Sequence, residues 1–465
     1  MRHRHDTTGS LTHSVETYVH VGFRRYALVA TYADRQKPVQ SYLCHERELA
    51  IRWPEGLSEH IDAEQRRARL AERHRLLLRT RTDNLPEIAD DLVALHSSDP
   101  VSVFLSAMAR MVHPSVEAVE GALYTDRSLI RHHGMRRTLW VATPPVVRLM
   151  HAAATRDLIA TERRRTRQLL AASGVDDPEQ WLAEAEVQVL ADLREHGPST
   201  AREIGQRGGA LRQRLQLAPG KAYAAVQSAH TRVLYILGFD GKMLRGRPSS
   251  WINGAYRYVD AESWLPGGLG DLDPRQAAAE LADRWLQRFG PATTTDLQWW
   301  MGWTMSRTRQ ALADCRAVEA ELDGGAGWLA ADDPPLNPAE PWVAVLPGLD
   351  PTIMGWKQRD WYLPSTSVEV FDTAGNAGPS LWVDGRVVGA WAQTRDGTIH
   401  THYFERVAAA RRREIDQRIN ELKSWIGDTR FTVRFPGDIH ARLLGTRTVP
   451  GPGVRRRDSA KEQKA

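Results

Sequence analysis

The chain has 465 residues, of which 42% are hydrophobic and 26% are charged, so we expect a folded protein of three or four compact units. The formal net charge is only +5, so any surface for a polyanion must be local. The two cysteines give no disulfide framework or thiolate zinc site, and no apolar run is long enough to span a membrane.

Residues 1–60 form an N-terminal extension whose place in the natural protein the sequence leaves open. Strand-like stretches occur at 18–21 and 26–29, but the scattered histidines match no metal-ligand spacing, so disorder is the favoured interpretation. A start codon assigned too early would also explain this segment. The first residues lack the apolar core of a secretory signal, and the Arg- and Ala-rich composition favours a bacterial cytoplasm.

The first predicted unit spans 65–150. Helices are expected over 64–79, from Pro86, from Asp99-Pro100 and over 116–123, and residues 129–141 read as strand, turn, strand. Helices followed by a hairpin describe a winged helix. The basic residues of this hairpin are candidates for contact with DNA: Arg131, His132, His133, Arg136 and Arg137. A hairpin that helps to lift a base out of the stack and a plain basic wing are both open.

A long basic helix is predicted over 145–170, and it contains Arg163, Arg164 and Arg165. These three side chains form either a solvated helix face or a face that contacts phosphates, and both interpretations stay open.

Two segments, 197–204 and 290–297, share one pattern: a Gly-Pro turn, a Ser or Thr cap, and an acidic residue in the next helical turn. A capping hydroxyl accepts hydrogen bonds from free N–H groups at a helix start, and the acid complements the helix dipole. The pattern is the front half of a helix-turn-helix unit. Because such arrays most often bind DNA, we favour double-stranded DNA as the partner over a protein-interaction scaffold.

The second unit, 180–262, has predicted helices at 181–194 and 222–234. A hairpin at 237–247 follows, with Asp240-Gly241 as its turn. Its basic residues are further candidates for DNA binding: Lys242, Arg245 and Arg247.

The third unit, 274–332, has helices at 275–289 and 305–317, and between them a helix that carries Trp299, Trp300 and Trp303. We expect these tryptophans to form core rather than a stacking platform for bases. The wing at 318–329 is acidic, so we expect it to pack against protein.

After a Pro-rich linker the pattern changes to short strands, which predict a β-rich domain over 342–430 closed by a helix at 407–426. His400 and His402 share one strand face but have no evident third ligand, so we expect no metal site. Residues 450–465 form a polar tail that we expect to be disordered. The predicted fold is therefore mainly α with small β-wings: tandem winged-helix units plus a C-terminal antiparallel β-domain.

Several motifs occur together in one order: 92–95, 137–140, 290–293, 296–300, 346–350 and 383–389. As a set over about 70–430, the chain resembles the bacterial winged-helix DNA-binding family that includes the AlkZ/YcaQ-type DNA glycosylases. The resemblance implies a protein that excises alkylated bases or unhooks crosslinks, without metal or small-molecule cofactor. It also implies a catalytic Gln-x-Gln or Gln-x-Asp motif directly after a helix that ends in an aliphatic-Leu pair.

At that place this chain has His96-Ser97-Ser98-Asp99, so His96 and Ser98 depart from the motif. An imidazole can orient water and a carboxylate can stabilise an oxocarbenium-like centre, so His96, Ser98 and Asp99 are the catalytic candidates. Asp99 before Pro100 is also an ordinary helix cap. Two functions stay open: a monofunctional DNA N-glycosylase, and a non-enzymatic regulatory or damage-sensing DNA-binding protein. Either is expected to be a cytoplasmic, nucleoid-associated monomer.

Overall fold

The structure is a computed structural model that describes residues 13–21, 24–32, 60–217, 225–334, 336 and 339–445. The chain divides into two units, residues 1–57 and residues 58–465, and each is described by itself. In the first unit, β1 (His13–Val21) and β2 (Arg24–Tyr32) pair as an antiparallel hairpin. The tail at 450–465 lies outside the described residues.

The second unit contains the succession helix, strand, helix, helix, strand, strand twice, and a third time with a single β-bridge in place of the first strand. The first repeat consists of α2 (Leu85–Asp91), β4 (Leu95–His96), α3 (Pro100–Met108), α4 (Val116–Glu120), β5 (Ile130–His133) and β6 (Leu139–Ala142). Its antiparallel sheet has the strand order β4-β6-β5. The helix α1 (Ala63–Arg73) precedes it, and β3 (His60–Ile61) pairs with β12 (Val318–Leu322), which belongs to the third repeat.

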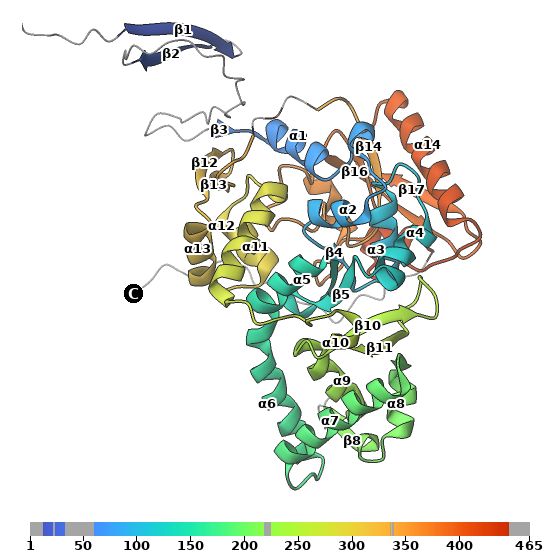
Figure 1. Cartoon of the computed structure of the whole chain (residues 1–465). Coiled ribbons are helices and arrows are strands. Elements are labelled where there is room, and N and C mark those ends of the chain that lie inside the picture. The colour runs from blue at the N-terminus through green and yellow to red at the C-terminus, as the bar shows by residue number, and fades with distance from the viewer. Residues whose placement is uncertain are drawn as a thin grey trace, which may run out of the picture. The chain divides into compact units, whose positions relative to one another are not determined.

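A helical connection joins the first repeat to the second. It runs from α5 (Pro144–Met150) through a π-helical turn (His151–Thr155) into α6 (Arg156–Ala172). In Figure 1, α6 leads away from the body of this unit toward α7 (Pro178–His196), α8 (Ala201–Arg207), α9 (Ala229–Phe239) and β8 (Arg214–Leu217).

The second repeat consists of α7 (Pro178–His196), β7 (Ser199–Thr200), α8 (Ala201–Arg207), α9 (Ala229–Phe239), β10 (Met243–Pro248) and β11 (Tyr256–Asp260). Its sheet has the order β7-β11-β10. A hairpin of β8 (Arg214–Leu217) and β9 (Ala225–Ser228) is inserted between α8 and α9, and the short helix α10 (Ala261–Trp264) follows β11.

The third repeat consists of α11 (Pro274–Phe289), α12 (Thr294–Met301), α13 (Met305–Asp314), β12 (Val318–Leu322) and β13 (Gly325–Leu329). Ala292, after α11, forms a single β-bridge with Trp328 of β13, in the place that β4 and β7 occupy in the other repeats.

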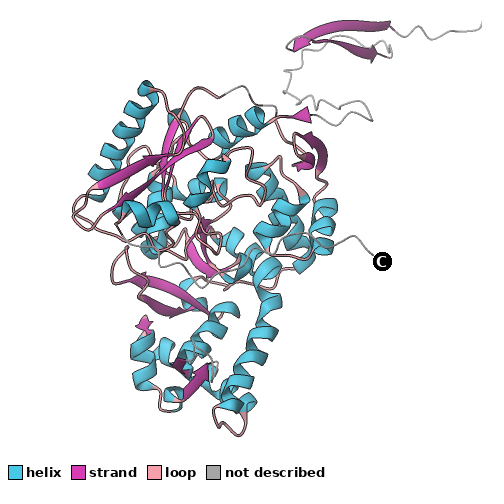
Figure 2. Ribbon diagram, turned by 180° about the vertical axis from the view of Figure 1, so that it is seen from behind, coloured by secondary structure: helices cyan, strands magenta, loops and turns pink. Residues whose placement is uncertain are grey.

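The remaining chain forms a four-stranded antiparallel sheet with neighbouring strands in sequence order. These strands are β14 (Val343–Leu346), β15 (Ser380–Val383), β16 (Arg386–Gln393) and β17 (Ile399–Tyr403). The helix α14 (Ala409–Ile426) lies beside this sheet, as Figure 2 shows from behind, and α15 (Asp438–Leu443) follows. No described helix is both long and apolar enough to cross a membrane.

The predicted helix caps are confirmed. Thr200 and Thr293 each form a capping box, with Glu203 and Asp296 as the reciprocal acids, and Asp99 caps α3 with Pro100 in the first turn. These caps depend on residues three positions apart, which is why the local sequence specifies them.

Three predicted elements are wrong in their extent. The helix predicted over 64–79 ends at Arg73, because the chain turns at Arg75 with a positive φ of 53°. The helix predicted over 222–234 begins only at Ala229, because the residues before it pair as strand β9. Asp240-Gly241 is not a hairpin turn: it follows the end of α9, and the hairpin is formed by β10 and β11.

The hydrophobic core consists of one large cluster that connects the repeats and of smaller clusters within single repeats. The large cluster contains Trp140 of the first repeat, Val259 of the second, Trp300 of the third and Trp382 of β15. The helices α2, α3 and α4 pack around a cluster of their own, and most of the second repeat packs around another, which runs from Leu170 of α6 to Met243 of β10. Trp300 and Trp303 are buried as predicted, whereas Trp299 is only half-buried.

Candidate functional site

The candidate catalytic segment, residues 96–99, connects β4 to α3. His96 pairs with Trp140 of β6, and the N–H of Ser97 donates to the carbonyl of Leu139 at 2.7 Å, so the segment remains attached to the sheet. Two residues later Asp99 begins α3. Both ends of the segment are therefore held by regular structure.

The imidazole of His96 lies in the interior. The side chain is 3% exposed, and its ring centroid is 4.5 Å from that of Trp140. Burial, with the nearby Arg136 cation, lowers the pKa of His96 to about 3, so the ring is neutral near pH 7. The N–H of Ser98 donates to Nδ1 at 3.4 Å. Since Nδ1 accepts, the neutral ring carries its hydrogen on Nε2, and His96 offers a hydrogen-bond donor rather than a base there.

The carboxyl group of Asp99 is half-buried and lies beside a small cavity, away from the ring of His96. Its Oδ1 accepts the N–H of Val101 at 3.3 Å. Burial raises the pKa of Asp99 to about 6, against the opposing effects of that hydrogen bond and of Arg434. Asp99 and Arg434 line a small, mostly apolar cavity together with the loop at Gly348. Near neutral pH this group is a carboxylate close to its titration range, which suits acid–base or charge-stabilising chemistry.

The candidate segment does not gather its side chains at one point. His96 packs against Trp140, whereas Asp99 faces the cavity with Arg434; no contact among the described residues joins the two side chains. Ser98 lies half-buried between them. The arrangement can supply a donor on one side and a carboxylate on the other.

Arg131, His132 and His133 are not on an exposed wing tip, which corrects the expectation of a phosphate-contacting surface at these three positions. They lie in β5 and are 2%, 2% and 5% exposed. The ring of His133 stacks on Phe239 of α9, with 4.3 Å between centroids. Packing against the second repeat, which the local sequence does not reveal, covers this strand.

The two histidines of β5 are neutral. Burial is the main cause that lowers the pKa of His133, to about 3, and that lowers the pKa of His132 well below its usual range. His132 Nε2 lies 3.2 Å from Nδ1 of His151 in the π-helical turn, a hydrogen bond between two buried imidazoles. These rings therefore carry no charge that could attract a phosphate near neutral pH.

Arg131 instead forms hydrogen bonds in the interior that hold the candidate segment in place. Its Nε donates to Oγ of Ser97 and its Nη1 donates to the hydroxyl of Tyr124, both at 2.8 Å. The guanidinium also lies 4.7 Å from the ring centroid of Tyr256 in β11. Arg131 thus connects the candidate segment with β11 of the second repeat.

Arg136 and Arg137 form the turn between β5 and β6, and both have positive φ angles, 52° and 61°. Arg136 is half-buried, with its guanidinium 4.1 Å from the ring centroid of Trp299. Burial lowers the pKa of Arg136 to about 10, and the neighbouring Arg359 adds to the effect. Arg137 is exposed and lies 3.6 Å from a carboxylate oxygen of Glu162.

The basic run on α6 is largely paired. Arg163 binds Glu186 through two hydrogen bonds, of 2.6 and 2.9 Å, and also binds Asp240 at 2.9 Å. Arg165 lies 2.8 Å from Glu162. Arg164 is exposed and has no ion-pair partner among the described residues.

The basic residues in and next to the hairpin of β10 and β11 are divided in the same way. Lys242 lies 2.8 Å from Asp240, and Arg247 lies 2.5 Å from Glu120. Arg245 is half-buried, 5.5 Å from the ring centroid of Tyr256. Its Nε has no hydrogen-bond partner among the described groups.

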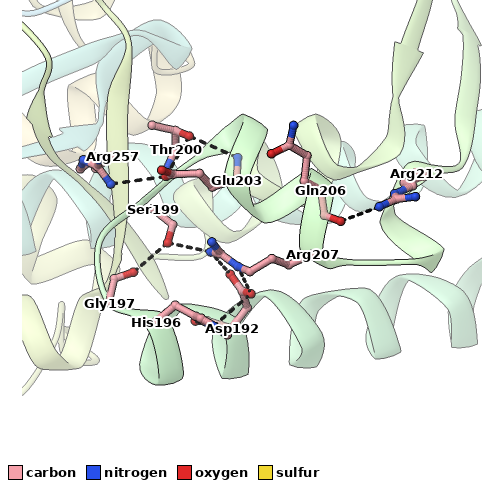
Figure 3. A network of polar contacts seen from close by, with 10 residues as sticks. All are labelled: Asp192, His196, Gly197, Ser199, Thr200, Glu203, Gln206, Arg207, Arg212 and Arg257. Carbon is pink, nitrogen blue, oxygen red and sulfur yellow. Dashed lines mark hydrogen bonds and ion pairs between the residues drawn. The ribbon is translucent and has the colours of Figure 1, made fainter.

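The Gly-Pro turn of the second repeat is held by a closed polar network (Figure 3). Asp192 of α7 accepts two hydrogen bonds of 2.6 Å from Arg207 of α8, and Arg207 also donates to Oγ of Ser199 at 2.7 Å. Arg257 of β11 donates to Glu203 at 3.3 Å. These charges neutralise one another, so the network fixes the angle between α7 and α8 more than it attracts an anion.

His400 and His402 are both exposed on β17. Among the described residues, no group of three or more His, Cys, Asp or Glu side chains is arranged to hold a metal ion.

Two residues of the site were missed from the sequence. Arg434 meets Asp99 only through folding of distant loops, so no local signal marks it. Glu162, directly before the basic run, is the carboxylate on which several arginines converge, and its spacing of three from Arg165 on a helix was an available signal.

Comparisons with known proteins place this geometry in context. Residues 89–425 match the protein family described as DNA glycosylase AlkZ-like. Among solved structures, the chain is similar to Streptomyces sahachiroi DNA glycosylase AlkZ, with a TM-score of 0.61 and 20% identity over 81% of this chain and 99% of that one. A comparison with curated protein sequences finds no match.

Proposed function

Because the chain belongs to the AlkZ-like DNA glycosylase family, we propose that it binds double-stranded DNA through three tandem winged helices and excises alkylated bases as a monofunctional N-glycosylase. The repeated order of helix, strand, helix, helix, strand, strand supports the winged-helix assignment. The shared strand order of the first two sheets supports it further.

The observation that carries the catalytic proposal is the Asp99 carboxyl group. It stands at the end of the segment where the family resemblance implies catalysis, it is half-buried beside a cavity, and its pKa is raised to about 6. A carboxylate in such a place attracts a nearby positive charge more strongly than a carboxylate in water does, because the surrounding apolar groups screen the interaction poorly.

The proposed reaction needs no metal or cofactor. A water molecule adds to C1′ of the deoxyribose as the N-glycosidic bond breaks, and the bonding electron pair leaves with the base. An alkylated purine is already cationic, so it departs as a neutral base. The Asp99 carboxylate stabilises the positive charge at C1′ and takes the proton that water releases. His96, as an Nε2–H donor, orients the water from the other side of the segment once the bound nucleotide places that water between the two side chains, and the Ser98 hydroxyl assists.

Specific observations also favour a second candidate, a DNA-binding protein without catalysis. His96 is 3% exposed and packed on Trp140. Asp99 already accepts the N–H of Val101, as a purely structural helix cap would. On this alternative, residues 96–99 connect β4 to α3 and cap the helix but do not catalyse base excision.

Base release from a duplex that contains N7-methylguanine separates the two candidates. Asp99→Asn removes the carboxylate but keeps a good helix cap, whereas Asp99→Ala removes both. We expect release by the native protein and a loss of at least about 100-fold in both variants, with only Asp99→Ala less stable, by about 1 kcal/mol. Tight duplex binding without release of any alkylated base would contradict the glycosylase proposal and leave the non-enzymatic function.

His96→Gln and His96→Ala test the donor role. The Gln amide retains an N–H donor, so we expect His96→Gln to keep most of the release rate while His96→Ala loses about tenfold or more. Equal rates in the two variants and the native protein, measured under single-turnover conditions, would remove His96 from the mechanism.

A further inference from the structure

Glu162 of α6 is a buried carboxylate, 4% exposed, that three arginines approach from three elements. Arg165 Nη1 lies 2.8 Å from Oε1, Arg137 Nε lies 3.6 Å from Oε1, and Arg232 Nη2 lies 3.6 Å from Oε2. Arg137 comes from the β5–β6 turn of the first repeat and Arg232 from α9 of the second, so the cluster exists only where these parts of the chain meet.

The cluster has an excess of positive charge that remains accessible. Three guanidinium groups face one carboxylate, which leaves two cations uncompensated. The side chains of Arg137, Arg165 and Arg232 are 41%, 51% and 20% exposed. Arg163, by contrast, is held by both Glu186 and Asp240.

A donor in the cluster has no acceptor. Nε of Arg232 is buried and has no hydrogen-bond partner among the described groups. The guanidinium of Arg232 lies 5.3 Å from the ring centroid of Tyr235, one turn further along α9. The ion pair, the contact with Tyr235 and a hydrogen bond of 3.3 Å from Nη2 to Oγ1 of Thr166 together hold this guanidinium group in place before an anion binds.

The backbone brings Arg137 to the cluster at an energetic cost. Arg136 and Arg137 both adopt left-handed φ angles, which disfavour residues with a Cβ atom by roughly 1–2 kcal/mol each. Backbone strain of this kind is often concentrated at binding and catalytic sites.

We infer that this cluster, which we call the Glu162 clamp, binds one phosphate group of a nucleic-acid backbone through Arg137, Arg165 and Arg232. Glu162 is a positioning residue: it orients the guanidinium groups and does not touch the phosphate. The inference rests on the proposed binding of duplex DNA and adds a defined contact to it. Guanidinium groups recognise phosphate oxygens through paired N–H donors, and orienting them in advance reduces the entropy lost on binding.

Glu162→Gln tests whether Glu162 orients the arginines. A pure effect of net charge and a loss of this orientation predict opposite changes in duplex affinity. Removing an acid raises the net charge by one, so charge alone predicts tighter duplex binding. Loss of the carboxylate that orients the three guanidinium groups predicts weaker binding. We expect duplex affinity to fall about threefold or more at about 0.15 M salt. Glu186→Gln is the matched control, because it also removes a buried carboxylate next to α6. It should leave affinity unchanged or raise it slightly. If Glu162→Gln leaves duplex affinity unchanged or raises it, as the control does, the inference that Glu162 orients a phosphate-binding cluster is wrong.

Arg232→Gln tests the phosphate contact itself. The slope of log affinity against log salt concentration should become shallower by about one, and equally so for unrelated sequences, whereas Arg167→Gln, on the same helix as Arg165, should leave it unchanged. Equal slopes in both variants would overturn the inference while duplex binding stands.

A native protein without salt-dependent duplex affinity would instead contradict the proposed function. The clamp is then tested with inorganic phosphate alone. Phosphate should raise the melting temperature of the native protein more than that of Arg232→Gln, and an equal rise would overturn the clamp.

Discussion

At the scale of single residues, a fully buried ion pair connects two distant parts of the chain. Arg110, just after the end of α3, binds both carboxylate oxygens of Asp350 at 2.9 Å, and both side chains are 0% exposed. Arg110 also donates to the carbonyl of His74 at 2.8 Å and to the hydroxyl of Thr352 at 2.8 Å. Asp350 belongs to the motif at 346–350, so the pair gives that motif a structural role in tying α3 to the chain after β14.

Asp350→Asn should destabilise the protein by about 3–5 kcal/mol, because it leaves the Arg110 cation buried without a counter-charge. Glu369→Gln, which breaks the exposed pair with Arg442, should cost less than about 1 kcal/mol. Urea unfolding of the two variants measures both values. A similar, small cost for Asp350→Asn would mean that its pair with Arg110 is not what holds α3 in place.

Local sequence predicts what local contacts decide. The caps at Asp99, Thr200 and Thr293 follow from residues within one helical turn, and the structure has all three. The burial of Arg131 and His133 depends on packing against Tyr256 and Phe239, more than 100 residues away, so their charge and spacing suggested a surface that does not exist. Arg232 was missed for the same reason, since its carboxylate partner lies on another helix.

At the scale of elements, the β5–β6 turn combines backbone strain with accessible charge. Its position between β5, which packs on the second repeat, and Trp299 of the third explains why the left-handed pair persists: neighbouring elements fix the path of the chain. The sequence predicted this hairpin but not the conformation of its turn, because neither Arg136 nor Arg137 is a residue that favours positive φ.

Arg137→Gly and Arg137→Ala separate strain from binding. Both remove the guanidinium group and should weaken duplex affinity equally. Only glycine tolerates the φ of 61° without strain, so Arg137→Gly should be more stable than Arg137→Ala by about 1 kcal/mol. Thermal unfolding and duplex titration of the pair measure the two effects, and equal stabilities would argue against strain in this turn.

At the scale of the whole molecule, several histidines are buried and neutral at contacts between elements far apart in the sequence. Burial lowers the pKa to about 3 for His74, His96 and His133, to about 4 for His151 and His440, and well below its usual range for His132. Both His132 and His133 lie at contacts between the first repeat and its neighbours.

These histidines predict loss of stability in mild acid. Above about pH 6.5 the rings are neutral in the folded and the unfolded chain, and their contribution is complete. As the pH falls below about 6.5, the unfolded chain takes up protons that the folded chain cannot, so at about pH 5 each such ring costs up to about 2 kcal/mol. The melting temperature should therefore drop steeply from about pH 7 to about pH 5. A melting temperature that stays constant over this range would show that the rings are accessible to protons in the folded state.

The single-turnover rate of base release, followed from about pH 5 to about pH 8 with the fold monitored by circular dichroism, tests the catalytic proposal most directly. If the Asp99 carboxylate acts in the reaction, the rate rises with pH up to about 6 and is level above it, and Asp99→Asn shows neither the rate nor the inflection. Absence of release at every pH from folded protein bound to the lesion-containing duplex, or an inflection that persists in Asp99→Asn, would contradict it.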